Sequence, residues 1–202
     1  MQYSAGMVST LFWFNETKET IGLINSGLSN EEILKKVVDE NIYQLKNIDR
    51  RKRTCRCILK RISALPNEII SRFYEIDNSS AKILVLISIM KTDLLFFEFV
   101  YEVYRQKIIL GEKFLEDKDL NLFFDYKYEQ SEIVRKWSDS GIKKLKSCYV
   151  KLLKEAGLLS ENNREVLKPL INYKIEEILK AKGLQVYLKA VKGEAWNVKY
   201  RW

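Results

Sequence analysis

Hydrophobic residues recur every three or four positions along most of the chain, which is the spacing of amphipathic α-helices. The first such run covers residues 10–26. The second starts at Ser29, where the sequence SNEE places Glu32 for a capping box. The third is expected to begin with Asp49 as its N-cap and to end near Ser63. The pattern therefore predicts three helices with short connections in the first third of the chain.

A longer and more uniformly apolar run occupies residues 80–110. It is apolar around much of its circumference, as is typical of a central helix that packs on several sides. We expect one long helix here, or two helices joined end to end. Gly111 is expected to close this run, because glycine adopts the left-handed backbone that follows many helices.

The second half of the chain repeats the rhythm of the first. Residues 117–128 read as a helix, Ser131 can cap a short helix, and a longer amphipathic helix covers residues 138–157. The stretch LLSENNREVLKPL then places a polar turn between two short apolar pieces, the size of a small β-hairpin. A last helix is expected over residues 170–181, followed by a basic and aromatic tail for which the pattern predicts no structure.

The pattern thus predicts a mainly α-helical protein. Two helix-turn-helix-like trihelical lobes would flank a long central helix, with room for a small β-hairpin wing after residue 157. We expect an N-terminal lobe with a basic third helix over residues 1–78, and the central core helix over residues 79–112. A winged-helix-like lobe is expected over residues 113–170, and the C-terminal helix and tail over residues 171–202.

Composition favours the helical interpretation and excludes several kinds of chemistry. Among 202 residues there are only two prolines and eight glycines. The absence of histidine excludes histidine metal ligands and an imidazole general base, and three cysteines cannot build a four-cysteine zinc site. No glycine-rich phosphate loop or paired catalytic residues are present. We therefore expect a protein that is not an enzyme and that has no metal and no cofactor.

Two features of the sequence argue for a cytoplasmic protein with no membrane contact. The most apolar segment, ILVLISIM at residues 83–90, is far shorter than the roughly 20 residues that cross a bilayer. The amino-terminal residues lack the basic and apolar regions of a secretory signal. An odd number of cysteines also suits a reducing compartment better than a disulfide framework.

The charge is concentrated in the third predicted helix, NIDRRKRTCRCILKRI (residues 47–62). The whole chain has 35 basic and 27 acidic residues, which favours attraction to polyanions. On a helical wheel the apolar residues of this helix form one compact stripe, and Arg51 lies over it. The remaining cations fall on the opposite arc: Arg50, Lys52, Arg53, Arg56, Lys60 and Arg61.

A solvated helix face usually mixes both signs, whereas like charges three or four residues apart repel. This arc therefore predicts a phosphate-binding surface. The alternative is that acidic residues in the segment 112–132 neutralise it within the protein. A second basic helix starts at Ser138, whose hydroxyl and neighbouring free amides suit a phosphate oxygen, and carries Lys143, Lys144 and Lys146. This second helix could equally be a lysine-rich solvated surface.

These residues favour a protein that grips double-stranded DNA by its phosphates. RNA is equally open as the nucleic acid, because contacts between arginine and phosphate are common to both. A third interpretation is a protein-interaction module whose basic helix docks on an acidic partner.

The chain also resembles the BrxA family, through motifs spread over residues 3 to 160. They are Tyr3-Ser4-Ala5-Gly6, Glu40-Asn41-Ile42-Tyr43-Gln44, Lys52-Arg53, Lys91-Thr92 with Phe96, Phe97, Phe99 and Val100, Gln130-Ser131, Trp137-Ser138-Asp139, Lys143-Lys144-Leu145-Lys146, and Glu155-Ala156-Gly157-Leu158-Leu159. At one position the chain departs from the family pattern: Gly141 stands where we expect threonine.

BrxA proteins are small proteins encoded in BREX bacteriophage-defence clusters, beside a DNA methyltransferase, a phosphatase-like protein and ATPases. The resemblance implies a cytoplasmic, non-enzymatic member of such a system, with other BREX components as partners. It also implies an all-helical fold, since the family has been likened to the RNA-binding factor NusB.

Overall fold

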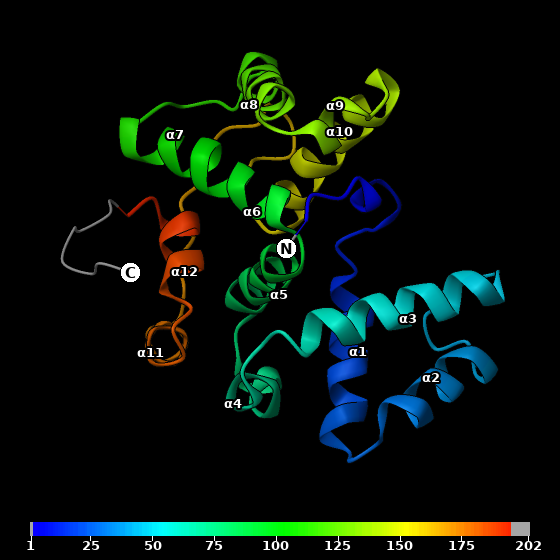
Figure 1. Ribbon diagram of the computed structural model, residues 1–202. Helices are drawn as coiled ribbons and strands as arrows, with labels where there is room; N and C mark the ends of the chain where they lie inside the picture. Colours follow the sequence, from blue (N-terminus) through cyan, green and yellow to red (C-terminus); the bar gives the residue numbers. More distant parts are fainter. Residues whose placement is uncertain (1, 195–202) are drawn as a thin grey trace.

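The protein is mainly α-helical, as predicted, in a computed structural model that describes residues 2–194 (Figure 1). The helices of this part are, in chain order, η1 (Gly6–Ser9), α1 (Phe14–Asn25), α2 (Asn30–Asp39), α3 (Ile48–Ile62), α4 (Asn67–Ser71), η2 (Phe73–Glu75), α5 (Asn78–Thr92), α6 (Leu94–Phe99), η3 (Val100–Tyr104), α7 (Arg105–Leu110), α8 (Asp117–Gln130), α9 (Glu132–Arg135), α10 (Asp139–Glu155), α11 (Tyr173–Ala181) and α12 (Gln185–Lys192).

Helices α1, α2 and α3 contact one another and form the expected N-terminal trio. The capping box at the start of α2 is confirmed. The hydroxyl of Ser29 accepts a hydrogen bond from the backbone amide of Glu32 at 3.3 Å, and the carboxylate of Glu32 accepts one from the backbone amide of Ser29 at 2.8 Å. The predicted cap of α3 is wrong by two residues. Asn47, not Asp49, accepts the amide of Arg50 at 3.0 Å, so Asp49 lies inside the first turn.

The first helix begins at Phe14, later than the apolar pattern indicates. Trp13 has a left-handed backbone with φ of 53°, and residues 10–13 are not helical. The amphipathic spacing of this segment reflects its burial, since Met7 and Phe12 are buried in the core. A buried extended segment and a helix can show the same short run of apolar residues.

The central run is divided, which confirms the alternative of helices joined end to end. Asp93 has an extended backbone between α5 and α6, and its carboxylate accepts the amide of Phe96 at 2.9 Å. Between α6 and α7 the chain forms a π-helical turn, η3, that the sequence pattern did not predict. Gly111 closes α7 with a φ of 68°, as predicted.

In the second half, Ser131 caps α9 as predicted, and of the two possible starts of the next helix, Ser138 and Asp139, it is Ser138 that caps α10. The expected β-hairpin is reduced to isolated antiparallel bridges, and residues 2–194 contain no continuous strand. The reason is that residues 164–167 divide their backbone bonds between two neighbours: Val166 donates to Lys113 at 2.9 Å, and Leu167 to Leu158 at 2.9 Å.

The C-terminal part contains one helix more than we predicted. The last predicted helix is α11, and α12 follows it within the stretch for which the pattern gave no structure. The rest of the predicted tail, residues 195–202, lies outside the described residues.

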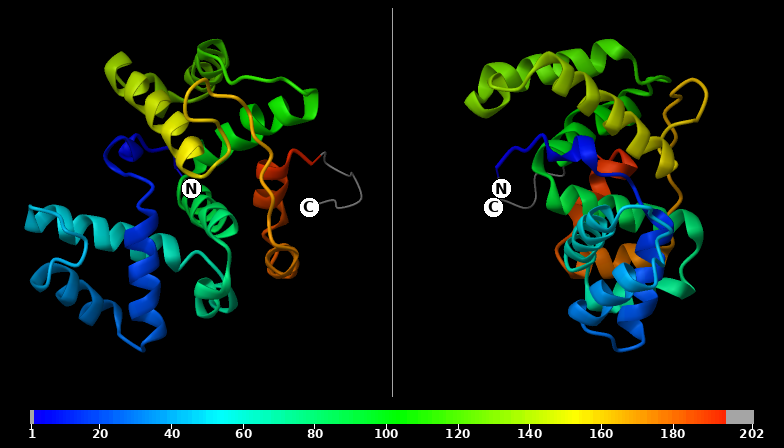
Figure 2. Two further views of the ribbon diagram at one scale, coloured as in Figure 1. Left: turned by 180° about the vertical axis from the view of Figure 1, so that it is seen from behind. Right: turned by 90° about the vertical axis from the view of Figure 1, so that its right-hand side faces the viewer.

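The hydrophobic core is continuous from Met7 to Val191, with α5 at its centre. Between Ser80 and Met90 every side chain except Lys82 is buried. The views in Figures 1 and 2 agree that α5 lies between the N-terminal trio and the group formed by α8, α9 and α10. The division of the chain into four segments and the helix-turn-helix character of the two trios stay predictions.

Candidate nucleic-acid interface

Helix α3 packs against α1, α2 and α5. Its buried stripe includes Cys55, Ile58 and Ile62. On the other side four cationic residues are exposed and one is half-buried. They are Arg50, Arg53, Arg56 and Lys60, with Lys52 half-buried.

These five side chains form no ion pair and no side-chain hydrogen bond with any of residues 2–194. Lys60 interacts electrostatically with the half-buried Asp93 but forms no ion pair with it. Burial raises the pKa of Asp93, while the amide of Phe96 and the nearby Arg61 and Lys60 act in the opposite direction. The cationic arc of α3 is therefore not neutralised by carboxylates within bonding distance in the described part.

Arg61 corrects the prediction made from the helical wheel. Its side chain is buried, with 3% of the residue exposed, and its Nη1 donates to the carbonyl oxygen of Leu11 at 2.7 Å. The guanidinium also lies 5.3 Å from the centre of the Trp13 ring, in a cation–π contact. Residues 11–13 cover the end of the arc at which Arg61 lies, so Arg61 is not a phosphate ligand.

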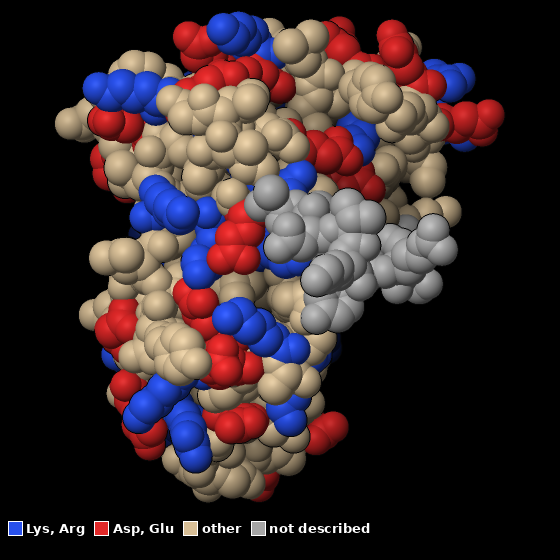
Figure 3. Space-filling model, turned by 90° about the vertical axis from the view of Figure 1, so that its left-hand side faces the viewer, with Lys and Arg blue, Asp and Glu red and all other residues tan. Residues whose placement is uncertain are grey.

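The acidic segment 112–132 does not neutralise α3, which was the alternative explanation. Four of its seven acidic residues pair with cations outside α3, and none of the seven forms an ion pair with α3 in the described part of the chain. Lys107 binds Glu112 and Asp119, and Asp117 binds Arg164 at 2.5 Å. Basic and acidic side chains are likewise interspersed on the side of the molecule drawn in Figure 3, which carries α7 and α12.

Two further cations near α3 complete its description. Lys46, just before the N-cap, is exposed and forms no ion pair within residues 2–194, although the sequence analysis did not single it out. Its position outside the amphipathic run is the reason that the helical wheel missed it. Arg51, in contrast, is fixed by the carbonyl oxygens of Leu45 at 2.6 Å and Val38 at 2.9 Å.

Helix α10 presents its cations differently. Ser138 is committed to the helix cap, because its Oγ accepts the amide of Gly141 at 3.2 Å. Lys143 and Lys144 are exposed, and neither forms an ion pair with a described residue. Lys146 is partly engaged, since its Nζ donates to Asn121 Oδ1 at 2.7 Å.

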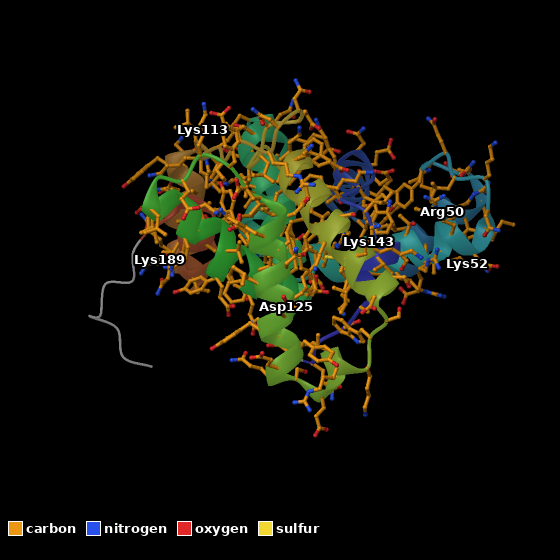
Figure 4. The ribbon with its side chains drawn as sticks, turned by 90° about the horizontal axis from the view of Figure 1, so that it is seen from above. Arg50, Lys52, Lys113, Asp125, Lys143 and Lys189 are labelled. Atoms are coloured by element: carbon orange, nitrogen blue, oxygen red, sulfur yellow. The ribbon has the colours of Figure 1, made fainter. Side chains whose placement is uncertain are left out.

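A groove of about 760 Å³ runs between α8 and α10. Two of the lysines of α10, Lys143 and Lys146, line it, opposite residues of α8 such as Asp125 (Figure 4). The charged residues of the groove are Lys143, Lys146 and Arg164 with Asp117, Asp125 and Asp139. Because the two signs balance, this part of α10 is a weaker surface for a polyanion than α3.

The two basic helices nevertheless lie toward one side of the molecule. In Figure 4, Arg50 and Lys52 of α3 and Lys143 of α10 occupy the same side of the view, away from Lys113 and Lys189. Of the predicted residues, Arg61 is buried and Ser138 caps α10, and the cations of the two helices have no contact with each other that would neutralise or join them in the described part of the chain.

The family model of BrxA matches residues 1–183. The chain belongs to the BrxA family. A relative from Bacillus cereus strain H3081.97, named BREX protein BrxA, is 39% identical over 194 residues, which cover 95% of this chain and 97% of the relative.

The BrxA resemblance predicted from sequence motifs is thus confirmed. A crystal structure of an uncharacterized protein from Magnetospirillum magneticum is similar with a TM-score of 0.81. The match covers 96% of this chain and all of that one at 19% identity, and it supports the fold alone.

Several of the BrxA-like motifs serve the fold instead of the basic surface. The hydroxyl of Tyr3 donates to Glu98 at 2.7 Å, and the hydroxyls of Tyr43 and Thr20 share a buried hydrogen bond of 2.5 Å. Gly157 ends α10 with a φ of 77°. Within residues 2–194 there is no cluster of side chains suited to a metal ion, and no helix there is long and apolar enough to cross a bilayer.

Proposed function

We propose that this member of the BrxA family is a non-enzymatic DNA-binding accessory protein of a BREX bacteriophage-defence system. The BREX assignment follows the name of its Bacillus cereus relative. The DNA-binding role rests on one observation: the exposed cations of α3 have no ion-pair partner in the described part of the chain. Its site of action is the cytoplasm, and its partners there are duplex DNA and other BREX components.

The spacing of the α3 cations suits a phosphate backbone. Arg50, Arg53, Arg56 and Lys60 follow one another at three- and four-residue steps, so they form a stripe along the helix. Ten residues of helix rise about 15 Å. One DNA strand carries a phosphate about every 3.4 Å of helix axis, so this stripe faces about four phosphates.

Helix α10 adds a smaller second contact. Lys143 and Lys144 are exposed near its N-terminal end, and in the view of Figure 4 Lys143 lies on the same side as Arg50 and Lys52 of α3. With these two lysines the number of phosphate contacts rises to about six. The logarithm of the affinity should fall with the logarithm of the salt concentration with a slope of about −3.6 if α3 alone binds and of about −5.4 if both helices bind.

The decisive test combines this salt series with charge reversal on α3. In a gel-shift assay, the variant Arg50→Glu, Arg53→Glu, Arg56→Glu should lose duplex binding by more than about 100-fold, because phosphate contacts supply most of the affinity. Its helical circular-dichroism signal should be unchanged, since the three side chains are exposed and form no hydrogen bond or ion pair within residues 2–194.

A matched control makes the same change of charge elsewhere. Lys168, Lys174 and Lys182 are exposed residues in and beside α11. Their combined replacement by glutamate should reduce affinity only through the net charge, by less than about tenfold. An equal loss in both triple variants, or a flat salt response, would refute the proposed site.

The same experiment separates two alternatives. Preferential displacement of duplex DNA by RNA would identify an RNA-binding protein. Capture of an acidic BREX component after nuclease treatment, with no shift of duplex DNA, would identify an interaction subunit. In both cases the α3 variant should lose the interaction and the α11 variant should keep it.

A further inference from the structure

The N-terminal segment crosses the molecule between the two basic helices. Figure 1 and both views of Figure 2 show residues 6–13 passing between α3 and α10. Met7 and Phe12 within this segment are buried, at 4% and 1% exposure. The segment is therefore an integral part of the core and not a loose extension.

Each basic helix holds this segment with one side chain. From α10, the thiol of Cys148 donates to the carbonyl oxygens of Met7 at 3.3 Å and Thr10 at 3.7 Å. From α3, Arg61 donates to the carbonyl oxygen of Leu11 at 2.7 Å. Arg61 and Cys148 therefore bond to residues only one to four positions apart in the same segment, and we call these two side chains its anchors.

Arg61 also marks where the segment lies relative to the cationic arc. On the helical wheel of α3 it is about 20° from Arg50, within the arc that otherwise faces solvent. The segment therefore runs along the edge of the phosphate-binding stripe. Within residues 2–194 no ion pair or side-chain hydrogen bond joins α3 directly to α10. Both helices also pack on α5, which contacts their inner sides.

We propose that residues 7–13 form a strap that sets the spacing and orientation of α3 relative to α10, so that both helices contact one DNA duplex. Arg61 is then a positioning residue: it touches no phosphate, but it places the cations of α10 beside those of α3. This inference rests on the proposed function and adds to it that the two helices form a single binding surface.

The test asks whether a lysine of α10 contributes to binding only while the strap is anchored. Salt slopes for duplex DNA are measured for the wild type and for Arg61→Met, each with and without Lys144→Gln. In the wild type, Lys144→Gln should make the slope shallower by about 0.9, the contribution of one phosphate. In the Arg61→Met background it should change the slope by much less.

A merely destabilising substitution would not produce this pattern, because it would leave the contribution of Lys144 intact in the folded fraction. Arg61→Lys should restore the effect of Lys144→Gln, since a lysine can donate to the carbonyl oxygen of Leu11. An equal effect of Lys144→Gln in all backgrounds, or none in the wild type, would overturn the inference while leaving binding by α3 intact. Failure of the wild type to bind duplex DNA would instead overturn the proposed function.

A second pair of variants guards against loss of folding in Arg61→Met. Cys148→Ala removes the other anchor with little change in volume, and Cys148→Ser keeps a donor at that position. The alanine variant should reduce the effect of Lys144→Gln, and the serine variant should not. If Lys144→Gln changes the salt slope by the same amount in both Cys148 variants, the result would count against the strap.

Discussion

Lys127 offers the sharpest test of the physical picture, because it is a buried cation between two carboxylates. Its Nζ lies 2.7 Å from Glu98 Oε2 and 2.9 Å from Glu102 Oε1, and its side chain is 4% exposed. Tyr3 donates a further hydrogen bond to Glu98 at 2.7 Å. Replacing Lys127 by methionine keeps the aliphatic chain but leaves both carboxylates without their cation.

The cost of this change follows from the burial of the group. Breaking a buried ion pair by removing one partner costs about 3–5 kcal/mol. The side chains of Glu98 and Glu102 are 21% and 43% exposed, so water compensates part of the loss and we expect about 2–3 kcal/mol. For a protein of this size each kcal/mol corresponds to about 2–4 °C, which gives a fall in Tm of about 4–12 °C.

The pH dependence of this contribution has a definite sign. Burial lowers the pKa of Lys127, but its bonds to Glu98 and Glu102 outweigh burial, so the net shift is upward. A cation with a raised pKa stabilises the fold fully below its unfolded value and loses that effect as the pH rises through the folded value. The loss in Lys127→Met should therefore be constant from pH 7 to about pH 9 and shrink in strong alkali. Burial and Glu98 raise the pKa of Tyr3 to about 12, so the stabilising effect of this phenol also fades only above about pH 10.

Thermal unfolding followed by circular dichroism measures this effect. The control is Lys36→Met, which removes an exposed pair with Glu40 four residues away, worth about 0.3–0.5 kcal/mol. Adding Glu98→Gln and Glu102→Gln to Lys127→Met should recover part of the stability, because the uncompensated charges are then gone. A Tm for Lys127→Met as close to wild type as that of the control would refute this reasoning.

Two further substitutions test the packing of the core, again through the midpoint of thermal unfolding. Gly193 has a φ of 69°, and a Cβ at this position would collide with Ile108 of α7; Gly193→Ala should therefore lower the stability by about 2 kcal/mol or more. The buried hydroxyl of Tyr149 has no hydrogen-bond partner among residues 2–194, so Tyr149→Phe should leave the stability unchanged or raise it by about 1 kcal/mol. A large loss for Tyr149→Phe, or none for Gly193→Ala, would contradict the packing described above.

The sequence was a good guide wherever a local interaction decides the structure. Ser29 and Ser138 cap their helices through bonds to residues three positions away, and Gly111 takes the left-handed backbone that its place after an apolar run indicates. These features depend on a few neighbouring residues, so a single sequence contains the necessary information. The error of two residues at Asp49 arose because Asn47 competes for the same role.

Features that depend on distant residues could not be predicted in this way. The helical wheel places Arg61 beside Arg50 on an apparently free arc, and nothing within α3 shows that residues 11–13 will cover its end. The interruption at Asp93 is different, because its carboxylate caps α6 through a local bond to the amide of Phe96, and the polar residues Lys91-Thr92-Asp93 already break the apolar run in the sequence. The two isolated bridges, Leu159 with Val166 and Phe114 with Glu165, arise because a third segment, residues 113–115, shares the backbone bonds of residues 164–166.

The distribution of the acidic residues explains in part why the exposed cations of α3 form no ion pairs in the described part of the chain. Lys107 and Lys127 are each bound by two carboxylates, whereas Arg50, Arg53 and Arg56 have none within bonding distance in the described part of the chain. A buried lysine without a carboxylate would lower the stability of the fold by several kcal/mol. Carboxylates are therefore needed more at Lys107 and Lys127 than at the exposed cations of α3.

The exposed cations of α3 are cheaper to leave unpaired, because water screens them. Their repulsion at three- and four-residue steps amounts to a few tenths of a kcal/mol per pair. Folding therefore tolerates the cationic stripe but gains nothing from it. Its amphipathic core stripe would hold α3 in place equally well if the outer face mixed both signs. The proposed function accounts for the concentration of one sign on this face, because a bound phosphate backbone would offset the repulsion between these side chains.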